Sequence, residues 1–421
     1  MRRRRWIPLL WILTGGVALL LLLKFFVADV YRVDSGSMRP TIFGGRDRAD
    51  GEEDTEHVLV LYDRGFEPER FDLVVIRSPD GSQPLVKRVC GLPGEHLMIR
   101  DGDLFIGRAR LPPDAPRPAP VPVYDDRYLE PERFFERRRD GSVRREGGEW
   151  IVDGGALPPG SMLRYHPELR DDYLDRRHRR VPGVVDVNDA VLELEFRIEA
   201  PLAAQKLRFQ LVEQGDLFEV ELAARPAAGG SAAQGANLRL LRRDASKQLE
   251  KRDAVSDGFE VQESSLAEMQ VELAAGRWYR VAFSNIDNHL RVRCEGLALD
   301  LRCSYDENQP WPSPLPAGHK SLGWRVCFGA EAGRARFRAV RILRDLYYTD
   351  DGSFGVGSHP DSTKVPAPVS LGPDDYFLLG DNSAASTDSR HFGSVKAPQL
   401  LGRPLAVVWP RPRWLRAVER P

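Results

Sequence analysis

Residues 191–198 read VLELEFRI, and apolar and charged side chains alternate along this stretch. Successive side chains of a β-strand point to opposite faces, so the alternation predicts a strand with one buried and one solvated face. Similar alternation marks residues 207–211, 217–222, 278–283, 289–294 and 335–342. Such strands, separated by turns, predict an antiparallel, jelly-roll-like β-sandwich over residues 186–345.

The segments on either side of the sandwich also have the character of short strands. Strands are expected at residues 57–61, 73–76, 85–89, 96–99 and 104–106. The expected fold class is therefore mainly β, in which a domain of residues 30–185 and 346–421 is interrupted by the sandwich. Within this domain, residues 111–185 are rich in proline and charge and are expected to form an irregular insertion.

The composition excludes several classes of function. The 421 residues carry a net charge of −1, which predicts no nucleic-acid partner. Four cysteines are too few for a disulfide scaffold, and no Cys/His spacing suggests a zinc site. Cys294 and Cys303 could form a disulfide, although buried free thiols are favoured, and the state of Cys327 is open. The basic run 176–180 is interpreted as a solvated loop or as a contact with anionic lipid head groups.

The N-terminus has the features of a membrane anchor. Arg2 to Arg5 form a basic block, and residues 6–23 carry no charge. A helix of about 22 residues is ~33 Å long, which is enough to cross a bilayer core. A cleaved signal peptide is the competing interpretation, but its apolar region is normally only about 7–15 residues long. We therefore expect residues 1–29 to be a retained single-pass anchor with a cytoplasmic N-terminus, which leaves the remaining chain on the outer, periplasmic face of the inner membrane.

Residues 34–41 read DSGSMRPT and contain a candidate nucleophile just after the apolar segment. Pro40 favours an extended residue before it, so Ser37 is expected on a rigid, extended ledge. A serine hydroxyl needs a base to attack an amide. His391 is better explained by packing or a turn, whereas Lys87 lies in an apolar strand where burial would lower its pKa. An ordinary turn around Ser37 and a surface lysine at position 87 are the alternatives.

Three segments together carry a family resemblance: SGSMRPT at 35–41, KRVCGLPGE at 87–95 and GDNSAASTDSRHFG at 380–393. In this order, after an apolar anchor, they resemble the type I signal peptidases, a family of membrane-anchored Ser–Lys endopeptidases. The resemblance covers residues 1–110 and 346–410. The chain departs from the family pattern at Phe71, Cys90 and Phe392, none of which removes a catalytic group.

The resemblance implies the main catalytic roles. Ser37 would be the nucleophile and Lys87 the general base, and Ser386 would orient the lysine amine. Ser35 would donate a hydrogen bond to the oxyanion hole together with the backbone N–H of Ser37. The implied chemistry is a serine endopeptidase reaction that needs neither metal nor nucleotide.

Further residues are implied to support this site. Asp388 and Arg390 would form a structural ion pair near the lysine. Met38 would line the apolar substrate-binding surface. Asp381 and Asn382 are expected to shape a turn rather than to take part in the chemistry.

The implied function is that of signal peptidase I, which cleaves N-terminal signal peptides from exported precursors at the outer face of the cytoplasmic membrane. Secretory precursor proteins and the lipid bilayer would be its partners. The sandwich resembles laminin-G or concanavalin-like jelly rolls through residues 276–279 and 337–345, and its ligand is open.

Two other hypotheses come from different classes. One is a membrane-anchored binding protein with a lectin-like sandwich and an inactive peptidase domain. The other is a self-cleaving regulator of a related Ser–Lys class, whose cytosolic setting conflicts with the expected anchor.

Overall fold

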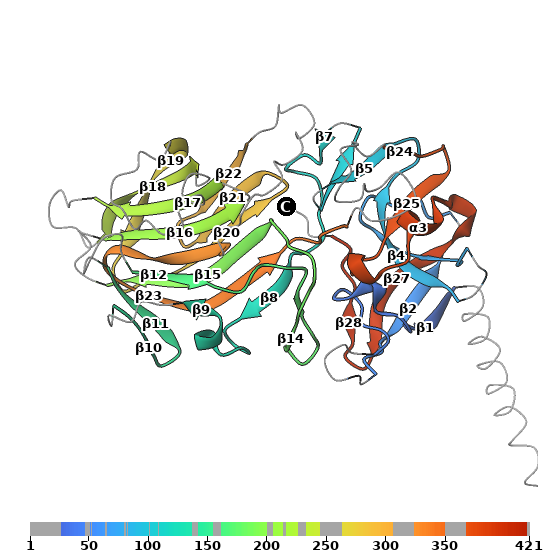
Figure 1. The fold of residues 1–421 in the computed structure, drawn as a ribbon, viewed down its shortest axis with the longest axis horizontal. Helices are drawn as coiled ribbons and strands as arrows, with labels where there is room; N and C mark the ends of the chain where they lie inside the picture. The colour runs from blue at the N-terminus through green and yellow to red at the C-terminus, as the bar shows by residue number, and fades with distance from the viewer. Residues whose placement is uncertain are drawn as a thin grey trace, which may run out of the picture. The chain divides into compact units, whose positions relative to one another are not determined.

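The computed structural model describes residues 27–46, 51, 53–63, 65–79, 81, 83–100, 102–107, 109–136, 142–154, 161–199, 205–213, 216–225, 233–244, 263–305, 324–349 and 368–418. The chain divides into two compact units, which are coloured by chain position in Figure 1. Unit 1 comprises Met1–Ala119 and Tyr347–Pro421, and unit 2 comprises Pro120–Leu346. Strands dominate both units, which confirms the prediction of a mainly β protein.

The described part of unit 1 is built from short strands and single turns of helix. Its strands are β1 (Ala28–Arg32), β2 (His57–Tyr62), β3 (Leu73–Ile76), β4 (Leu85–Gly91), β5 (His96–Arg100), β6 (Asp103–Ile106), β7 (Ala109–Arg110), β24 (Val369–Ser370), β25 (Asp375–Leu379), β26 (Val395–Lys396), β27 (Leu400–Trp409) and β28 (Arg413–Trp414). Its helical turns are η2 (Gly36–Met38), η5 (Ser383–Ala385), α3 (Ser389–Phe392) and η6 (Ala397–Gln399). The strands predicted between residues 57 and 106 are all present.

The main sheet of unit 1 has the order β1-β2-β27-β3-β4-β25-β26, and β28 pairs with β27. All of these pairings are antiparallel. The side chains of β3 alternate between two apolar clusters: Leu73 and Val75 pack in one, and Val74 and Ile76 pack in the other. Both faces of this strand are therefore buried, which explains why it reads as a continuous apolar run. Strands β24, β5, β6 and β7 form a second, smaller sheet.

The predicted membrane anchor lies, apart from residues 27–29, outside the described residues. Among the residues that are described, no helix has both the length and the apolar character needed to cross a bilayer. Residues 28–29 belong to strand β1.

Unit 2 contains two sets of longer antiparallel strands joined by one very long strand (Figure 1). Its elements are β8 (Val121–Asp125), η3 (Pro131–Arg133), β9 (Phe135–Glu136), β10 (Val143–Glu146), β11 (Glu149–Gly154), β12 (Ser161–Tyr165), β13 (Tyr173–Leu174), β14 (Arg180–Val181), β15 (Ala190–Ile198), β16 (Lys206–Glu213), β17 (Asp216–Ala224), β18 (Ala233–Asp244), β19 (Glu263–Ala274), β20 (Trp278–Ile286), β21 (His289–Glu295), β22 (Leu299–Ser304) and β23 (Val326–Arg344). The strand order is β19-β18-β17-β16-β23-β15-β20-β21-β22.

The core of unit 2 lies between the two sets of strands. Phe196 of β15 and Phe209 of β16 meet with ring centroids 5.7 Å apart, and both belong to one large apolar cluster. The inward residues of β15 are buried in alternation with half-buried charged ones, as the pattern of residues 191–198 predicts. Strands β18 and β19 were not predicted. The register of β18 shifts between Leu240 and Leu241, and such a bulge interrupts the alternation that marks a strand.

The predicted boundary between the units differs from the observed one. Residues 111–185 were expected to be an irregular part of the first domain, but unit 2 begins at Pro120. Short strands β8, β11 and β12 of that segment each pair with β23. β15 and β16 together pair with β23 along nearly its whole length, and the short strands pair with mostly the same β23 residues from the other edge. Local sequence gave little sign of these strands, since their partner lies far along the chain.

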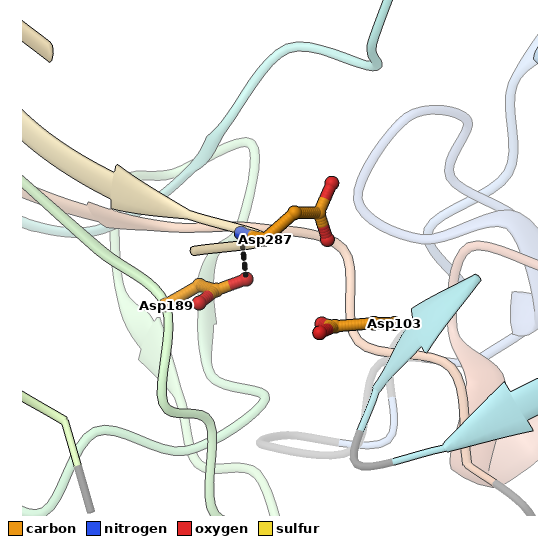
Figure 2. A group of neighbouring side chains, drawn as sticks. All are labelled: Asp103, Asp189 and Asp287. Atoms are coloured by element: carbon orange, nitrogen blue, oxygen red, sulfur yellow. Dashed lines mark hydrogen bonds between the residues drawn. The ribbon is translucent and has the colours of Figure 1, made fainter. Parts of the chain in front are cut away.

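Figure 2 draws Asp189 and Asp287 of unit 2 and Asp103 of unit 1. The turn between β20 and β21 has positive φ at Asp287 and Asn288, and the N–H of Asp287 donates a hydrogen bond to Asp189 (3.2 Å; Figure 2). Asp103, also drawn in Figure 2, belongs to β6 of unit 1 and pairs with Arg110.

All four cysteines are free thiols. In the register of β21 and β22, Cys294 is opposite Leu299 and Cys303 is opposite Leu290, so the two thiols lie at different levels.

The basic run 176–180 is a turn region of unit 2 whose charges are partly neutralised. The carboxylate of Asp175 accepts hydrogen bonds from the backbone of Arg177 and from the side chain of Arg179. Asp172 pairs in the same way with Arg180. These ion pairs favour the interpretation of a structured, solvated loop over that of a free cationic patch.

Candidate active site

The candidate nucleophile lies in a helical turn and not on an extended ledge. Residues 36–38 form the single 3₁₀ turn η2, which is closed by a hydrogen bond from the Arg39 N–H to the Gly36 carbonyl (3.2 Å). The flanking residues Ser35 and Arg39 are extended, as the following proline predicts for Arg39. The expectation for Ser37 itself was wrong, because an i→i+3 hydrogen bond curls the backbone there. Ser37 is 8% exposed.

Lys87 is held in the middle of the main sheet. Its strand, β4, is flanked by β3 and β25, and Lys87 is only 2% exposed. The Nζ atom lies 2.9 Å from the Oγ of Ser37 and 3.1 Å from the Oγ of Ser386. The fold therefore brings together three polar side chains from the three segments that were singled out in the sequence.

The buried position changes the acidity of the lysine. Burial disfavours the ammonium form and lowers the pKa of Lys87 to about 8, from an ordinary value of 10.5. The nearby charge of Asp388 opposes this shift, and that of Arg390 supports it. An amine with such a pKa is unprotonated in a substantial fraction of molecules slightly above neutral pH, and can then accept a proton.

Gly380 allows the last segment to approach the other two. A Cβ atom at this position would lie 2.2 Å from the Ser386 Oγ and 2.6 Å from the Ser37 carbonyl oxygen. Both distances are far below van der Waals contact, so only glycine fits here without displacing the backbone. Two residues later, Asn382 donates its N–H to the Ser37 carbonyl (3.0 Å) and its side-chain amide to the Gly36 carbonyl (2.9 Å).

Asp388 and Arg390 form an ion pair that is fully buried, with N and O atoms 2.8 Å apart. Burial by itself raises the pKa of the Asp388 carboxyl, but the hydrogen bonds and charge of Arg390 outweigh burial and lower it. Asp388 also accepts hydrogen bonds from the Gly380 N–H (3.0 Å) and from the Ser386 hydroxyl. Arg390 extends the network to the carbonyls of Ser383 (2.8 Å) and Thr349 (3.1 Å). The pair thus organises the loop that carries Ser386.

A second buried ion pair was not anticipated from the sequence. Arg88 contacts Asp381 through Nε and Nη2, at 2.7 and 2.6 Å, and both side chains are almost completely buried. The Thr41 hydroxyl also donates to Asp381. Because neighbouring side chains of a strand point to opposite faces, Arg88 turns away from the face that Lys87 occupies. No local signal identified Asp381 as the partner of Arg88, since it lies 293 positions further along the chain.

Of the remaining predicted residues, Ser35 and Met38 lie at the turn of the candidate nucleophile and His391 lies in α3. The Oγ of Ser35 is 3.2 Å from the Oγ of Ser37. Met38 is 1% exposed and packs in the apolar cluster with Val33 and Ile42, and its contact with substrate stays a prediction. His391 is 40% exposed and caps α3 together with Asp388, which agrees with the expected turn role.

This arrangement has the parts of a nucleophilic hydrolase. A hydroxyl group needs a neighbouring base to become a nucleophile, and a buried amine with a lowered pKa can serve as that base. Here such an amine lies within hydrogen-bond distance of a serine hydroxyl.

Solved structures that resemble the chain do so only weakly. A carbohydrate-binding module from Bacillus subtilis covers 53% of this chain and 96% of its own length, at 8% identity and a TM-score of 0.25. A legume lectin-like domain from Entamoeba histolytica covers 56% of this chain and 98% of its own length, at 8% identity and a TM-score of 0.31. Scores this low support no inference about a ligand, and the resemblance of the sandwich to laminin-G or concanavalin-like domains is not confirmed.

Sequence relatives and a family model are more informative. Signal peptidase I of Bacillus caldolyticus is 27% identical over 202 residues, which are 47% of this chain and 90% of the relative. Signal peptidase I of Streptococcus pneumoniae is 33% identical over 196 residues, which are 43% of this chain and 87% of the relative. The model of the family described as signal peptidase, peptidase S26, matches residues 3–157 and 349–409, more than half of the chain. From this match and the two relatives, we conclude that the chain belongs to the signal peptidase family, peptidase S26.

Proposed function

We propose that this protein is a signal peptidase I that cleaves signal peptides from exported precursors with a serine nucleophile and a lysine general base. The observation that carries the proposal is the 2.9 Å contact between the Lys87 amine and the Ser37 hydroxyl in a buried site. The lowered pKa of Lys87 supports the role of base. In this proposal unit 1 is the catalytic unit, and unit 2 is an inserted module without a part in the chemistry.

The proposed reaction has two stages. Neutral Lys87 accepts the proton of Ser37 as its Oγ attacks the carbonyl carbon of the scissile peptide bond. The oxygen that becomes negative accepts hydrogen bonds from the Ser37 N–H and the Ser35 hydroxyl. The C–N bond then breaks, and the amine of the mature protein leaves with the proton held by Lys87. In the second stage Lys87 takes a proton from a water molecule as the water oxygen attacks the ester carbon of the acyl-enzyme. The ester C–O bond then breaks, the Ser37 Oγ takes that proton back from Lys87, and the signal peptide leaves with a new carboxyl group.

Ser386 supports the proposed orientation of the amine. Its hydroxyl hydrogen bonds to Asp388, which leaves an Oγ lone pair free to accept an N–H of Lys87. The lone pair of the neutral amine can then point at the Ser37 hydroxyl. Asp388 and Arg390 act in this proposal by holding Ser386 and not by contacting substrate.

A location at the membrane surface is part of the proposal. Val30, Leu59, Ala406 and Trp414 are paired in one row across β1, β2, β27 and β28. Residues opposite one another in an antiparallel pair share a face of the sheet. Val30 is 45% exposed and Trp414 is 76% exposed. β1 contains residues 28–29, the end of the predicted anchor, so this apolar face supports contact with lipid head groups beside it.

Cleavage of a purified precursor with small residues before its mature start tests the function. The full chain in detergent is expected to release the mature protein, with the new N-terminus read by mass spectrometry. Ser37→Ala and Lys87→Ala are expected to lose at least ~10⁴-fold in rate, because the nucleophile and its base act as a unit. Lys396→Ala, which removes a surface lysine paired with Asp375, is the matched control and is expected to cleave normally.

The pH profile tests the role of the lysine. Activity is expected to rise with pH to a half-maximum near the pKa of Lys87, about 8, because only the unprotonated amine accepts a proton. Unchanged cleavage by Ser37→Ala or Lys87→Ala would exclude the proposed pair of residues. If wild type and Ser37→Ala both leave the precursor intact, the hypothesis of an anchored binding protein is favoured instead.

Fluorescence in proteoliposomes tests the membrane contact. Lipids brominated near the head group are expected to quench the tryptophan fluorescence of the wild-type protein. The quenched fraction is expected to be smaller in Trp414→Phe. Trp278→Phe in unit 2 is the control and should leave the fraction quenched by the lipid unchanged or higher. Equal quenching of wild type and Trp414→Phe would contradict the proposed contact.

A further inference from the structure

Asn382 connects the last segment of the site to the backbone of the candidate nucleophile. Its side-chain Nδ2 donates to the Gly36 carbonyl at 2.9 Å, across 346 positions of sequence. Its backbone N–H donates to the Ser37 carbonyl at 3.0 Å. The two carbonyls belong to successive peptide groups of the turn η2, so Asn382 holds this turn at two neighbouring points.

The side-chain contact has a specific geometric consequence. The carbonyl of Gly36 and the N–H of Ser37 belong to the same planar peptide group and point in opposite directions in its trans form. A hydrogen bond that fixes the direction of the Gly36 carbonyl therefore also fixes the direction of the Ser37 N–H. In the proposed function, this N–H is the backbone donor of the oxyanion hole.

Local structure constrains this peptide group only weakly. Within η2, the Gly36 carbonyl accepts the Arg39 N–H at 3.2 Å, a long hydrogen bond. Gly36 has no side chain that would restrict rotation of the peptide about its backbone bonds. The amide of Asn382 supplies a shorter contact to the same oxygen from a part of the chain that is itself anchored by the buried Arg88–Asp381 pair.

We propose that Asn382 is a positioning residue that sets the direction of the Ser37 N–H and thereby forms the oxyanion hole. The inference rests on the proposed function and adds to it a residue that the sequence had assigned only to a turn. Asn382 does not contact substrate in this proposal. It acts only through the Gly36–Ser37 peptide group, so its contribution falls on the transition state and not on substrate binding.

Steady-state kinetics of the full chain in detergent test the proposal. Asn382→Ala removes the contact to Gly36 and keeps the backbone contact to Ser37. We expect kcat to fall at least ~10-fold, a part of the ~100–1,000-fold that one oxyanion donor contributes. KM is expected to stay within about twofold, and the half-maximum of the pH profile to stay at the wild-type value, because Lys87 is untouched.

Two further variants sharpen the experiment. Asn382→Asp keeps the shape of the side chain but turns an acceptor oxygen towards the Gly36 carbonyl, so its kcat is expected to fall at least as far. Thr387→Ala changes an exposed side chain of the same loop and is expected to behave as wild type. Melting curves of all variants separate a loss of folding from a loss of activity.

Inhibitor binding gives a second readout that a purely structural role would not move. A peptide aldehyde adds the Ser37 Oγ to its carbonyl carbon, and the resulting hemiacetal oxygen occupies the oxyanion position. Asn382→Ala is expected to weaken binding of the aldehyde at least ~10-fold and binding of the corresponding peptide amide by less than about twofold. Equal weakening of both ligands, a kcat within twofold of wild type, or a shifted pH profile would each overturn the inference. Cleavage by wild type but not by Ser37→Ala shows that the proposed function holds whichever of these results is found.

Discussion

Arginine–carboxylate pairs lie in very different surroundings around the candidate active site of unit 1 and on the outer face of the sandwich in unit 2. In the first region, Arg88–Asp381 and Arg390–Asp388 are at most 2% exposed. On the outer face, Glu195 of β15 pairs with Arg338 of β23, whose side chain is 41% exposed. The same kind of contact is therefore almost free of solvent in one region and partly hydrated in the other.

The comparison indicates where charged pairs contribute most to the stability of this molecule. A buried pair is costly to break, because removing one partner leaves the other charge without water or compensation. An exposed pair contributes little, since water already solvates both groups. Burial around the candidate site also lowers the pKa of Lys87, so the same lack of solvent sets both stability and acidity there. The predictions below test this contrast.

Among substitutions that leave Ser37 and Lys87 in place, the largest effect on cleavage is expected from Gly380→Ala in the candidate active site. The new methyl group would overlap the Ser386 Oγ and the Ser37 carbonyl oxygen, and the latter belongs to backbone that cannot move aside easily. Cleavage is expected to fall at least ~1,000-fold, since misplacement by about 1 Å already costs ~100-fold. Gly235→Ala on β18 is the matched control, because the nearest atom to its new Cβ would be a side-chain carbon 3.7 Å away. Similar activity of the two variants would contradict close packing at Gly380.

Arg390→Met breaks one buried pair and is expected to cost about 3–5 kcal/mol of unfolding free energy. It also removes a positive charge that lowers the pKa of Lys87 and leaves Asp388, which raises it. The half-maximum of the pH–activity profile should therefore move above about 8. Chemical denaturation measures the loss of unfolding free energy. Cleavage rates at pH values from ~6 to ~10, on both sides of the Lys87 pKa, measure the shift of the profile. A profile that moves to lower pH would contradict the assigned charges.

Lys87→Met is expected to abolish cleavage and yet stabilise the fold near neutral pH. The folded pKa of about 8 lies below the ordinary 10.5, so the unfolded chain binds the proton more tightly. Stability is therefore lost as pH falls from 10.5 towards 8, and the penalty, about 3 kcal/mol, persists below this window. The variant removes that penalty but also two hydrogen bonds, for a net gain of about 1–2 kcal/mol at pH ~7.

Denaturation at several pH values checks this result. The gain of Lys87→Met over wild type is expected to shrink as pH rises from about 8 to 10.5, because the lysine loses its proton in both states across this range. A gain that does not depend on pH would mean that packing of the methionine, and not removal of a buried amine, explains it.

The smallest effect is expected from Glu195→Gln on the outer face of the sandwich. Glu195 pairs with both Arg280 and Arg338, but both arginines are more than one third exposed. The unfolding free energy should change by less than about 1 kcal/mol, and cleavage should stay at the wild-type rate. A loss of several kcal/mol would show that the surface network of unit 2 resembles the buried pairs of unit 1 more than its exposure suggests.

The sequence by itself determined the mainly β character and most of the site. Alternation along residues 191–198, 207–211 and 217–222 predicts strands because a strand places every second side chain on one face. Three short segments contained Ser37, Lys87 and Ser386, whose resemblance to known peptidases singled them out. Local order is enough for such predictions, since each one depends on a few consecutive residues.

Only the tertiary structure decided how these segments meet. The 3₁₀ turn at Ser37, the pairing of Arg88 with Asp381 and the contact of Asn382 with Gly36 have no local signal. The start of unit 2 at Pro120 likewise depends on short strands that pair with the distant β23. The turn at Ser37 is local, but Asn382 holds it from a distant segment, and the other features are themselves contacts between residues far apart in the chain. The physical reason is that burial and hydrogen bonding select among many locally acceptable backbones only when the distant partner is in place.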